Sequence, residues 1–88
     1  EAPESFEAQF ALGSFEQNLK HFSKATSTYS RAIVIASKAE NPDQLTRALS
    51  ELGTLYHNLN RMEEARQAFT EAIKTLRDPK SKKYQIKL

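Results

Sequence analysis

The chain has 88 residues, no cysteine and a formal net charge of +2, with 39% hydrophobic and 27% charged residues. This length allows one small domain, and without cysteine neither a disulfide nor a thiolate metal site can stabilise it. The longest apolar run, from Ala32 to Ala36, is far shorter than the roughly 18 residues of a membrane-spanning helix, so we expect no membrane insertion.

The first half of the chain predicts two helices. Pro3 suits a first helical turn and Glu7 suits the positive end of the helix dipole, so we expect the first helix over about 3–18. Its apolar residues spread around the helix, which predicts two packing contacts, and Gly13 predicts a close approach by the helix that follows. Apolar residues at helical spacing predict the second helix over about 22–39, with two buried sides.

The second half predicts two more helices and the start of a fifth. Asn41 and Pro42 form a cap-plus-proline signal, which predicts a helix over 42–58 with a buried stripe of Leu45, Leu49, Leu52 and Tyr56, flanked by Ala48 and Leu55. A fourth helix is expected over 62–77, with a buried face of Ala65, Ala68, Phe69, Ala72, Ile73 and Leu76. In the turn before it, Asn60 tolerates a left-handed backbone, and its counterpart Lys20 tolerates one less well. Asp78 and Pro79 repeat the start signal, so residues 79–88 are expected to open a fifth helix.

The two halves are copies of one pattern. The only glycines, Gly13 and Gly53, each follow a leucine and stand 40 residues apart. An alanine, an aromatic residue and a second alanine follow each glycine at the same distances along the chain. They are Ala25, Tyr29 and Ala32 after Gly13, and Ala65, Phe69 and Ala72 after Gly53. The chain is therefore a tandem repeat with units of about 3–40 and 42–78.

These positions resemble the tetratricopeptide repeat, whose pattern reads W-x2-L-G-x2-Y, then A-x3-F, then P. The second unit follows the pattern, with Leu49 in place of the tryptophan, whereas the first departs from it at Gln9 and Glu16. We expect Phe10 and Phe15 to fill the space of those two positions. The resemblance implies an all-α fold of antiparallel helix hairpins stacked as a right-handed α-solenoid, in which residues 79–88 are a partial third repeat or a capping helix.

The same resemblance implies a concave groove in which the first helix of each hairpin contacts a peptide or helix of another protein. Its wall would consist of Glu7, Phe10, Ser14 and Gln17 on the first helix and of Arg47, Ser50, Thr54, His57 and Asn58 on the third. Phe10 would supply an apolar anchor and the third helix polar pairing, although these residues could equally be the solvated sides of two helices. The positions of a clamp that grips the C-terminus of chaperones in some family members read Phe10, Ser14 and Glu51 here, so we expect no chaperone tail.

Two other functions stay open. Two repeats and a fraction make a short stack, which predicts a continuation of the chain beyond this segment, self-association or a C-terminal helix over the exposed end. In an assembly module of this kind, Tyr84, Ile86 and Leu88 would form the interface. Residues 77–88 also carry five basic groups against Asp78, so binding to nucleic acid or to an acidic surface is a weaker alternative.

No catalytic, metal or cofactor site is predicted. Ser50 and His57 are two helical turns apart, roughly 10 Å, which is too far for a nucleophile and its base. The two histidines, His21 and His57, lie in different repeats, and neither glycine has a second glycine near it for a phosphate loop. We expect a segment of a longer cytoplasmic or nuclear protein, since no signal peptide opens the sequence.

Overall fold

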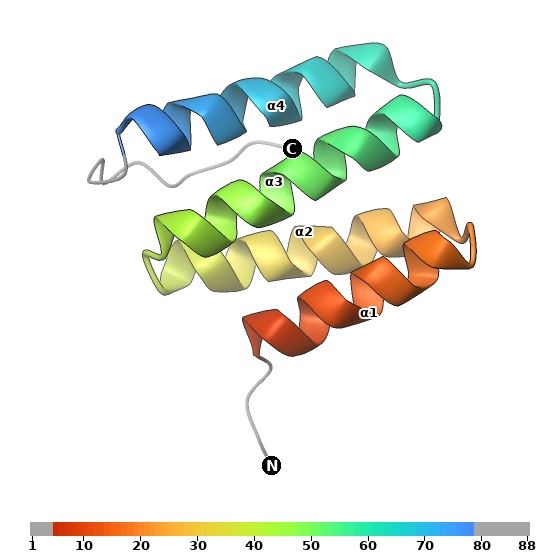
Figure 1. The fold of residues 1–88 in the computed structure, drawn as a ribbon, viewed down its shortest axis with the longest axis horizontal. Helices are drawn as coiled ribbons and strands as arrows, with labels where there is room; N and C mark the ends of the chain where they lie inside the picture. Colours follow the sequence, from red (N-terminus) through yellow and green to blue (C-terminus); the bar gives the residue numbers. More distant parts are fainter. Residues whose placement is uncertain (1–4, 79–88) are drawn as a thin grey trace.

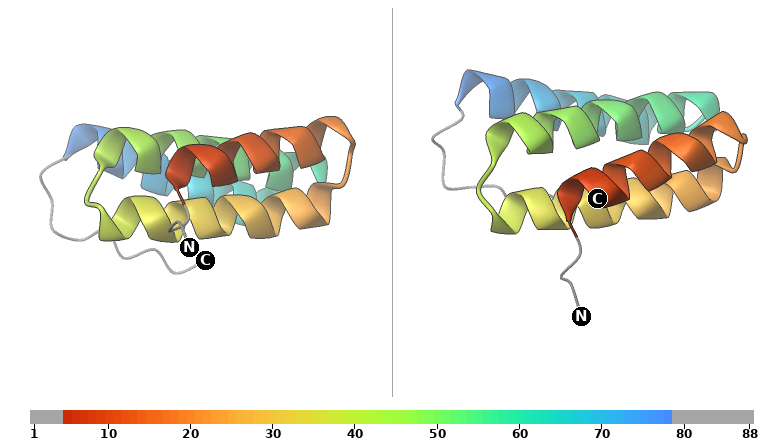
Figure 2. Two further views of the ribbon diagram at one scale, coloured as in Figure 1. Left: turned by 90° about the horizontal axis from the view of Figure 1, so that it is seen from below. Right: turned by 60° about the horizontal axis from the view of Figure 1, so that its bottom comes forward.

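The computed structural model describes residues 5–78, which form four helices in two consecutive hairpins (Figure 1). The helices are α1 (Phe6–Asn18), α2 (Phe22–Lys38), α3 (Pro42–Asn58) and α4 (Met62–Arg77). Each helix packs on the next one in sequence, and α1 and α3 run in the same direction on one side of α2 (Figure 2). The predicted all-α hairpins are confirmed, whereas the predicted fifth helix lies outside the described residues.

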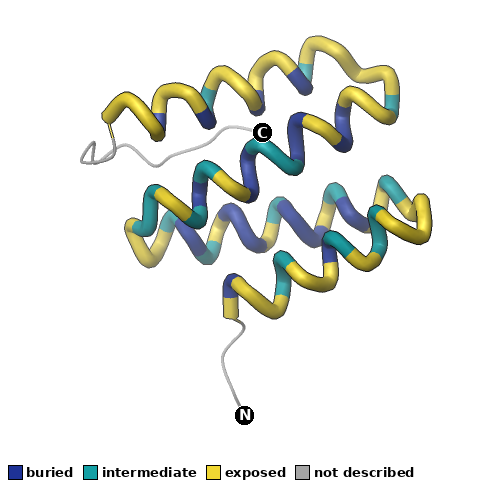
Figure 3. The backbone as a smooth tube through the Cα atoms, viewed as in Figure 1, coloured by how far each residue is buried: buried dark blue, intermediate teal, exposed yellow. Residues whose placement is uncertain are grey.

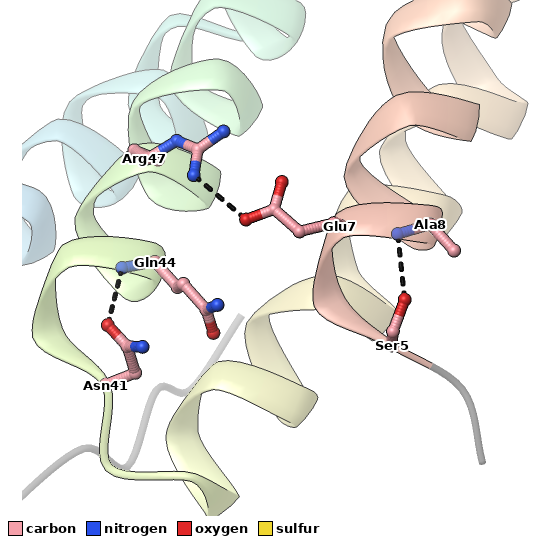
Figure 4. Close-up of polar contacts among 6 residues, drawn as sticks. All are labelled: Ser5, Glu7, Ala8, Asn41, Gln44 and Arg47. Carbon is pink, nitrogen blue, oxygen red and sulfur yellow. Dashed lines mark hydrogen bonds and ion pairs between the residues drawn. The ribbon is translucent and has the colours of Figure 1, made fainter.

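Side-chain caps mark the starts of α1 and α3, whereas the N-cap residues of α2 and α4 make no such bond. The Asn41 carboxamide oxygen accepts a hydrogen bond from the Gln44 N–H at 3.1 Å, and Pro42 takes the first helical position, as predicted (Figure 4). The prediction that α1 starts at residue 3 was wrong. The backbone of Ser5 is extended, and its hydroxyl accepts a hydrogen bond from the Ala8 N–H at 3.0 Å, so the helix begins at Phe6. The first N–H groups of a helix have no carbonyl partner within the helix. A serine cap accepts a hydrogen bond from one of them, whereas a proline in the first turn offers no side-chain acceptor.

The three connections between the helices have one geometry. Each contains a residue with positive φ, at 20-residue intervals: Lys20 (64°), Glu40 (52°) and Asn60 (65°). In the first connection, the His21 N–H donates to the Glu16 carbonyl and the Lys20 N–H to the Gln17 carbonyl, and the other two connections repeat both bonds. This pair of bonds is the Schellman motif, which satisfies the last carbonyl groups of each helix. The left-handed turn expected at Asn60 is thus confirmed.

The core lies between α2 and its two neighbours. All six residues expected on the buried side of α3 are buried, and Tyr29 of α2 is fully enclosed. A Cβ atom added to Gly13 would lie 2.8 Å from the Tyr29 ring, and one added to Gly53 would lie 2.7 Å from the Phe69 ring. The prediction that Gly13 admits the following helix is therefore confirmed. Glycine lets the ring of the second helix in each hairpin lie directly on the backbone of the first.

The predicted burial of α4 was wrong for three residues. Phe69, Ile73 and Leu76 are 38%, 52% and 65% exposed, whereas the alanines of the same helix are buried (Figure 3). The cause is that α4 is the last of the described helices. Within residues 5–78 it packs on α3 alone, so among these residues only α3 removes a side of α4 from water.

The two aromatic residues expected to fill the variant positions of α1 behave differently. Phe10 packs edge-on against the Tyr29 ring, with 5.3 Å between the ring centroids. Phe15 is 60% exposed and fills no such space, so that prediction was wrong. Glu16 itself faces α2, where its carboxylate accepts a hydrogen bond of 2.6 Å from the buried Thr28 hydroxyl.

Candidate partner-binding face

The predicted groove residues occupy equivalent positions in the two repeats. With the 40-residue register of the glycines, Glu7 corresponds to Arg47, Phe10 to Ser50, Ser14 to Thr54, Gln17 to His57 and Asn18 to Asn58. Because α1 and α3 run in the same direction side by side, equivalent positions project from equivalent faces of the two helices. We call this set, without Asn18, the α1–α3 face.

One end of the α1–α3 face is a compact cluster. The Arg47 guanidinium lies 3.3 Å from the Glu7 carboxylate (Figure 4) and its Cζ atom lies 4.6 Å from the centroid of the Phe10 ring. Phe10 stacks in turn on the buried Phe6, 5.5 Å between centroids. The structure therefore brings Glu7, Phe10 and Arg47 together, with the charged ends of Glu7 and Arg47 largely in solvent.

The rest of the α1 half is tied to the core. The Tyr29 hydroxyl lies 3.4 Å from the Ser14 hydroxyl, to which it donates, and 3.3 Å from the Gln17 side-chain oxygen. Burial raises the pKa of Tyr29, an effect that the Ser14 hydrogen bond opposes and the negative charge of Glu51 reinforces. The hydroxyl thus keeps its proton at neutral pH and remains a donor. Ser14 and Gln17 are consequently held against α2.

The α3 half has no such tether. Phe69 stands where Tyr29 stands in the first repeat and has no hydroxyl to offer to Thr54 or His57. Thr54, His57 and Asn58 are exposed and Ser50 is half-buried, and the Thr54 hydroxyl donates to the Ser50 carbonyl at 3.1 Å within its own helix. His57 is ten residues beyond Arg47 on α3, about 15 Å along the axis, so it lies apart from the Arg47 cluster.

A family model described as tetratricopeptide repeat matches residues 4–78. The chain belongs to the tetratricopeptide repeat family. The match spans all four helices and agrees with the two repeats read from the sequence. No curated protein and no solved structure matches the chain closely enough for comparison.

Two contributors to the α1–α3 face of this tetratricopeptide repeat domain were not predicted. Phe6 supports Phe10 and lies 5.6 Å, centroid to Cζ, from Arg47, and Tyr29 anchors Ser14 and Gln17. The sequence does hold a signal for Tyr29, because the equivalent residue of the second repeat is phenylalanine and only a hydroxyl distinguishes them. The predicted assembly residues Tyr84, Ile86 and Leu88, and the basic residues Lys80, Lys82, Lys83 and Lys87, lie outside the described residues.

Residues 5–78 contain neither a cluster of metal ligands nor a membrane-spanning helix. No three histidine or carboxylate side chains in that range gather where they could hold a metal ion. None of the four tetratricopeptide helices is both long enough and apolar enough to span a bilayer. The α1–α3 face is therefore the candidate site that the described residues offer.

Proposed function

We propose that this tetratricopeptide repeat domain is a non-catalytic interaction module that binds a peptide or helix of a partner protein on the α1–α3 face. The observation that carries the proposal is the difference between its two halves. Tyr29 ties Ser14 and Gln17 to the core, whereas the equivalent Thr54 and His57 are exposed. The α3 half therefore supplies recognition, and the α1 half supplies support.

Arg47 is the principal contact in this proposal. Glu7 and the Phe10 ring hold its guanidinium in place, which lowers the side-chain entropy that a partner must overcome. Glu7 approaches one of its terminal nitrogens, so other N–H groups of the fork remain for a carboxylate or carbonyl of the partner. The half-buried Phe10 adds an apolar surface beside this charge.

Farther along α3, Thr54, His57 and Asn58 would pair with polar groups of an extended or helical ligand. Their spacing along the helix suits a ligand that lies along α3, since together with Arg47 they extend over about 15 Å. In a right-handed solenoid of the family type, α1 and α3 line the concave side, and this geometry is part of the proposal. A groove of that form would let one ligand contact both helices.

A capture experiment tests the proposed face. The chain and an Arg47→Ala/His57→Ala variant are immobilised, and proteins retained from a cell lysate are identified by mass spectrometry. A matched control, Arg31→Ala/His21→Ala, removes the same two residue types from exposed positions outside the α1–α3 face. We expect the partner to be retained by the wild type and the control and lost by the Arg47/His57 variant. Equal retention by all three proteins would exclude recognition through α3.

A further inference from the structure

The first and the last of the four described helices each carry an apolar row that packs on no other helix of residues 5–78. On the outer side of α1, Ala8, Leu12, Phe15 and Leu19 recur at helical spacing, and the last three are 41%, 60% and 49% exposed. On the outer side of α4 the row is Met62, Ile73 and Leu76, with Met62 49% exposed. Phe69 is not part of this row, because its ring lies on Gly53 of α3. We call these sets the α1 row and the α4 row. Rows of this size at helical spacing are typical of faces that pack on another helix.

The interior of the molecule shows what such rows pack against. The register equivalents of the α1 row on α3 are Ala48, Leu52, Leu55 and Leu59, of which the first three are fully buried. Both helices pack on the one that follows, but α3 also packs on α2, which precedes it. Contact with that preceding helix is therefore what buries the row on α3.

The α4 row also has a register equivalent, on α2, that is buried by a second neighbouring helix. Its members there are Phe22, Ile33 and Ala36, of which the last two are buried and Phe22 is partly buried against the core. Both α2 and α4 pack on the helix before them, but α2 is also covered by α3, which follows it. The burial pattern indicates that the α2–α3 contact joins one row of each kind, whereas α1 and α4 each leave a matching row exposed in the described part of the chain.

We propose that copies of this chain associate head to tail, with the α4 row of one copy on the α1 row of the next, in the geometry of the α2–α3 contact. This proposal is independent of the partner bound on the α1–α3 face. A second copy is the occupant because it provides the complementary row and leaves neither row in water. Pairing of two α4 rows would leave both α1 rows exposed.

Charge on the helices of the α1–α3 face favours the same arrangement. In one copy, Glu7 of α1 and Arg47 of α3 form an ion pair. If a second copy stacks in the α2–α3 geometry, its first repeat takes the place of a third repeat. Its Glu7 would then lie beside Arg47 of the first copy, on the side opposite to the first copy's own Glu7. Along the stacked copies, the negative charge of Glu7 and the positive charge of Arg47 would then alternate, so that no two like charges are adjacent.

A head-to-tail contact is heterologous, so it extends without closing unless the rotation between copies forms a ring. The average mass in solution is therefore expected to rise with concentration beyond two chains. Sedimentation and light scattering from about 1 μM to about 1 mM, the range of weak protein association, measure this.

Two substitutions separate the rows. Phe15→Glu places a charge in the α1 row and Ile73→Glu places one in the α4 row, while Val34→Glu, at an exposed position of α2 outside both rows, is the matched control. Each row variant alone should be monomeric, and the control should associate like the wild type. An equimolar mixture of the two row variants should form a species of two chains and nothing larger, since each retains the row that the other lacks.

Three results would overturn the proposal. The wild type could remain monomeric throughout the concentration range, Phe15→Glu could associate like the wild type, as α4–α4 pairing requires, or the mixture could stay monomeric. Circular dichroism verifies that the variants are folded. If either is not, Leu19→Glu and Leu76→Glu repeat the test at other exposed positions of the same rows.

Discussion

Glu7 and Arg47 hold the same position in consecutive repeats and carry opposite charges, and their side chains meet at 3.3 Å across α1 and α3. Both are largely exposed, so the ion pair adds little to stability. Its effect is to orient Arg47, whose guanidinium also lies over the Phe10 ring. The pair thus belongs to the proposed recognition surface more than to the core.

A double-mutant cycle with Glu7→Gln and Arg47→Ala measures this pair. We expect a coupling free energy of about 0.2–1 kcal/mol in urea unfolding, smaller at high salt because the charges are solvated. Arg47→Ala alone should cost about 1 kcal/mol, since it also removes the contact with the aromatic rings. A coupling above about 2 kcal/mol would mean that the pair is a structural element and that capture results with Arg47 variants reflect misfolding.

The two glycines provide a matched pair of substitutions. Alanine at Gly13 would meet the fully buried Tyr29 ring, whereas alanine at Gly53 would meet the Phe69 ring, which is partly exposed and can tilt away. The helix propensity of alanine contributes about 1 kcal/mol of stability at both sites. We therefore expect Gly13→Ala to destabilise by about 1–3 kcal/mol and Gly53→Ala to be within about 1 kcal/mol of wild type in chemical unfolding. Equal effects would show that Tyr29 moves as freely as Phe69.

The left-handed residues between the helices predict stabilising changes. Lys20 and Glu40 have φ values of 64° and 52°, which cost a residue with a Cβ about 1 kcal/mol. Lys20→Gly and Glu40→Gly should each raise the free energy of unfolding by about 0.5–1 kcal/mol, and Asn60→Gly by less, because asparagine tolerates this conformation. Lys24→Gly inside α2 is the control and should lower it by about 1 kcal/mol. Thermal unfolding of the four variants ranks them directly.

Gln9 is the clearest polar defect of the first repeat. Its side-chain oxygen is buried and has no hydrogen-bond partner in the described part of the chain, while the equivalent Leu49 is fully buried in the second repeat. Gln9→Leu should raise the free energy of unfolding by about 1–2 kcal/mol, since it removes an unpaired buried acceptor and adds apolar contact. Gln67→Leu, at an exposed position of α4, should change stability by less than about 0.5 kcal/mol. A destabilised Gln9→Leu protein would mean that the amide has a partner in solution.

Alkaline pH tests the environment of Tyr29. Burial raises its pKa in the folded chain above the ordinary value near 10, and burial acts on Tyr56 in the same direction. The folded state then holds the proton more tightly than the unfolded state. The stabilisation from this difference is complete below about pH 10 and is lost as pH rises through the folded pKa. Unfolding of Tyr29→Phe between pH 8 and 11 should show a weaker decline than wild type, starting from a slightly lower stability because the hydroxyl proton shared between Ser14 and Gln17 is missing. Parallel profiles for the two proteins would contradict a raised pKa at Tyr29.

The sequence by itself determined the elements that depend on local chemistry. The start of α3, the close approach at Gly13 and the left-handed turn at Asn60 follow from a cap, a missing side chain and a tolerant residue, and these signals act within a few residues. The start of α1 at Phe6 also has a signal in the sequence, because Ser5 is a favoured N-cap residue. The prediction instead followed Pro3, two residues earlier.

Only the tertiary structure decided which side of each repeated pattern is covered. Tyr29 and Phe69 share one position in their repeats, yet the first is enclosed and the second partly exposed, because α3 follows α2 whereas no described helix follows α4. The two halves of the α1–α3 face differ for another reason: Tyr29 has a hydroxyl that Phe69 lacks, and the packing of α2 on α1 places that hydroxyl beside Ser14 and Gln17. The helical period of the sequence predicts which residues share a face. Whether that face is buried, hydrogen-bonded or exposed to water depends on the helix that packs beside it.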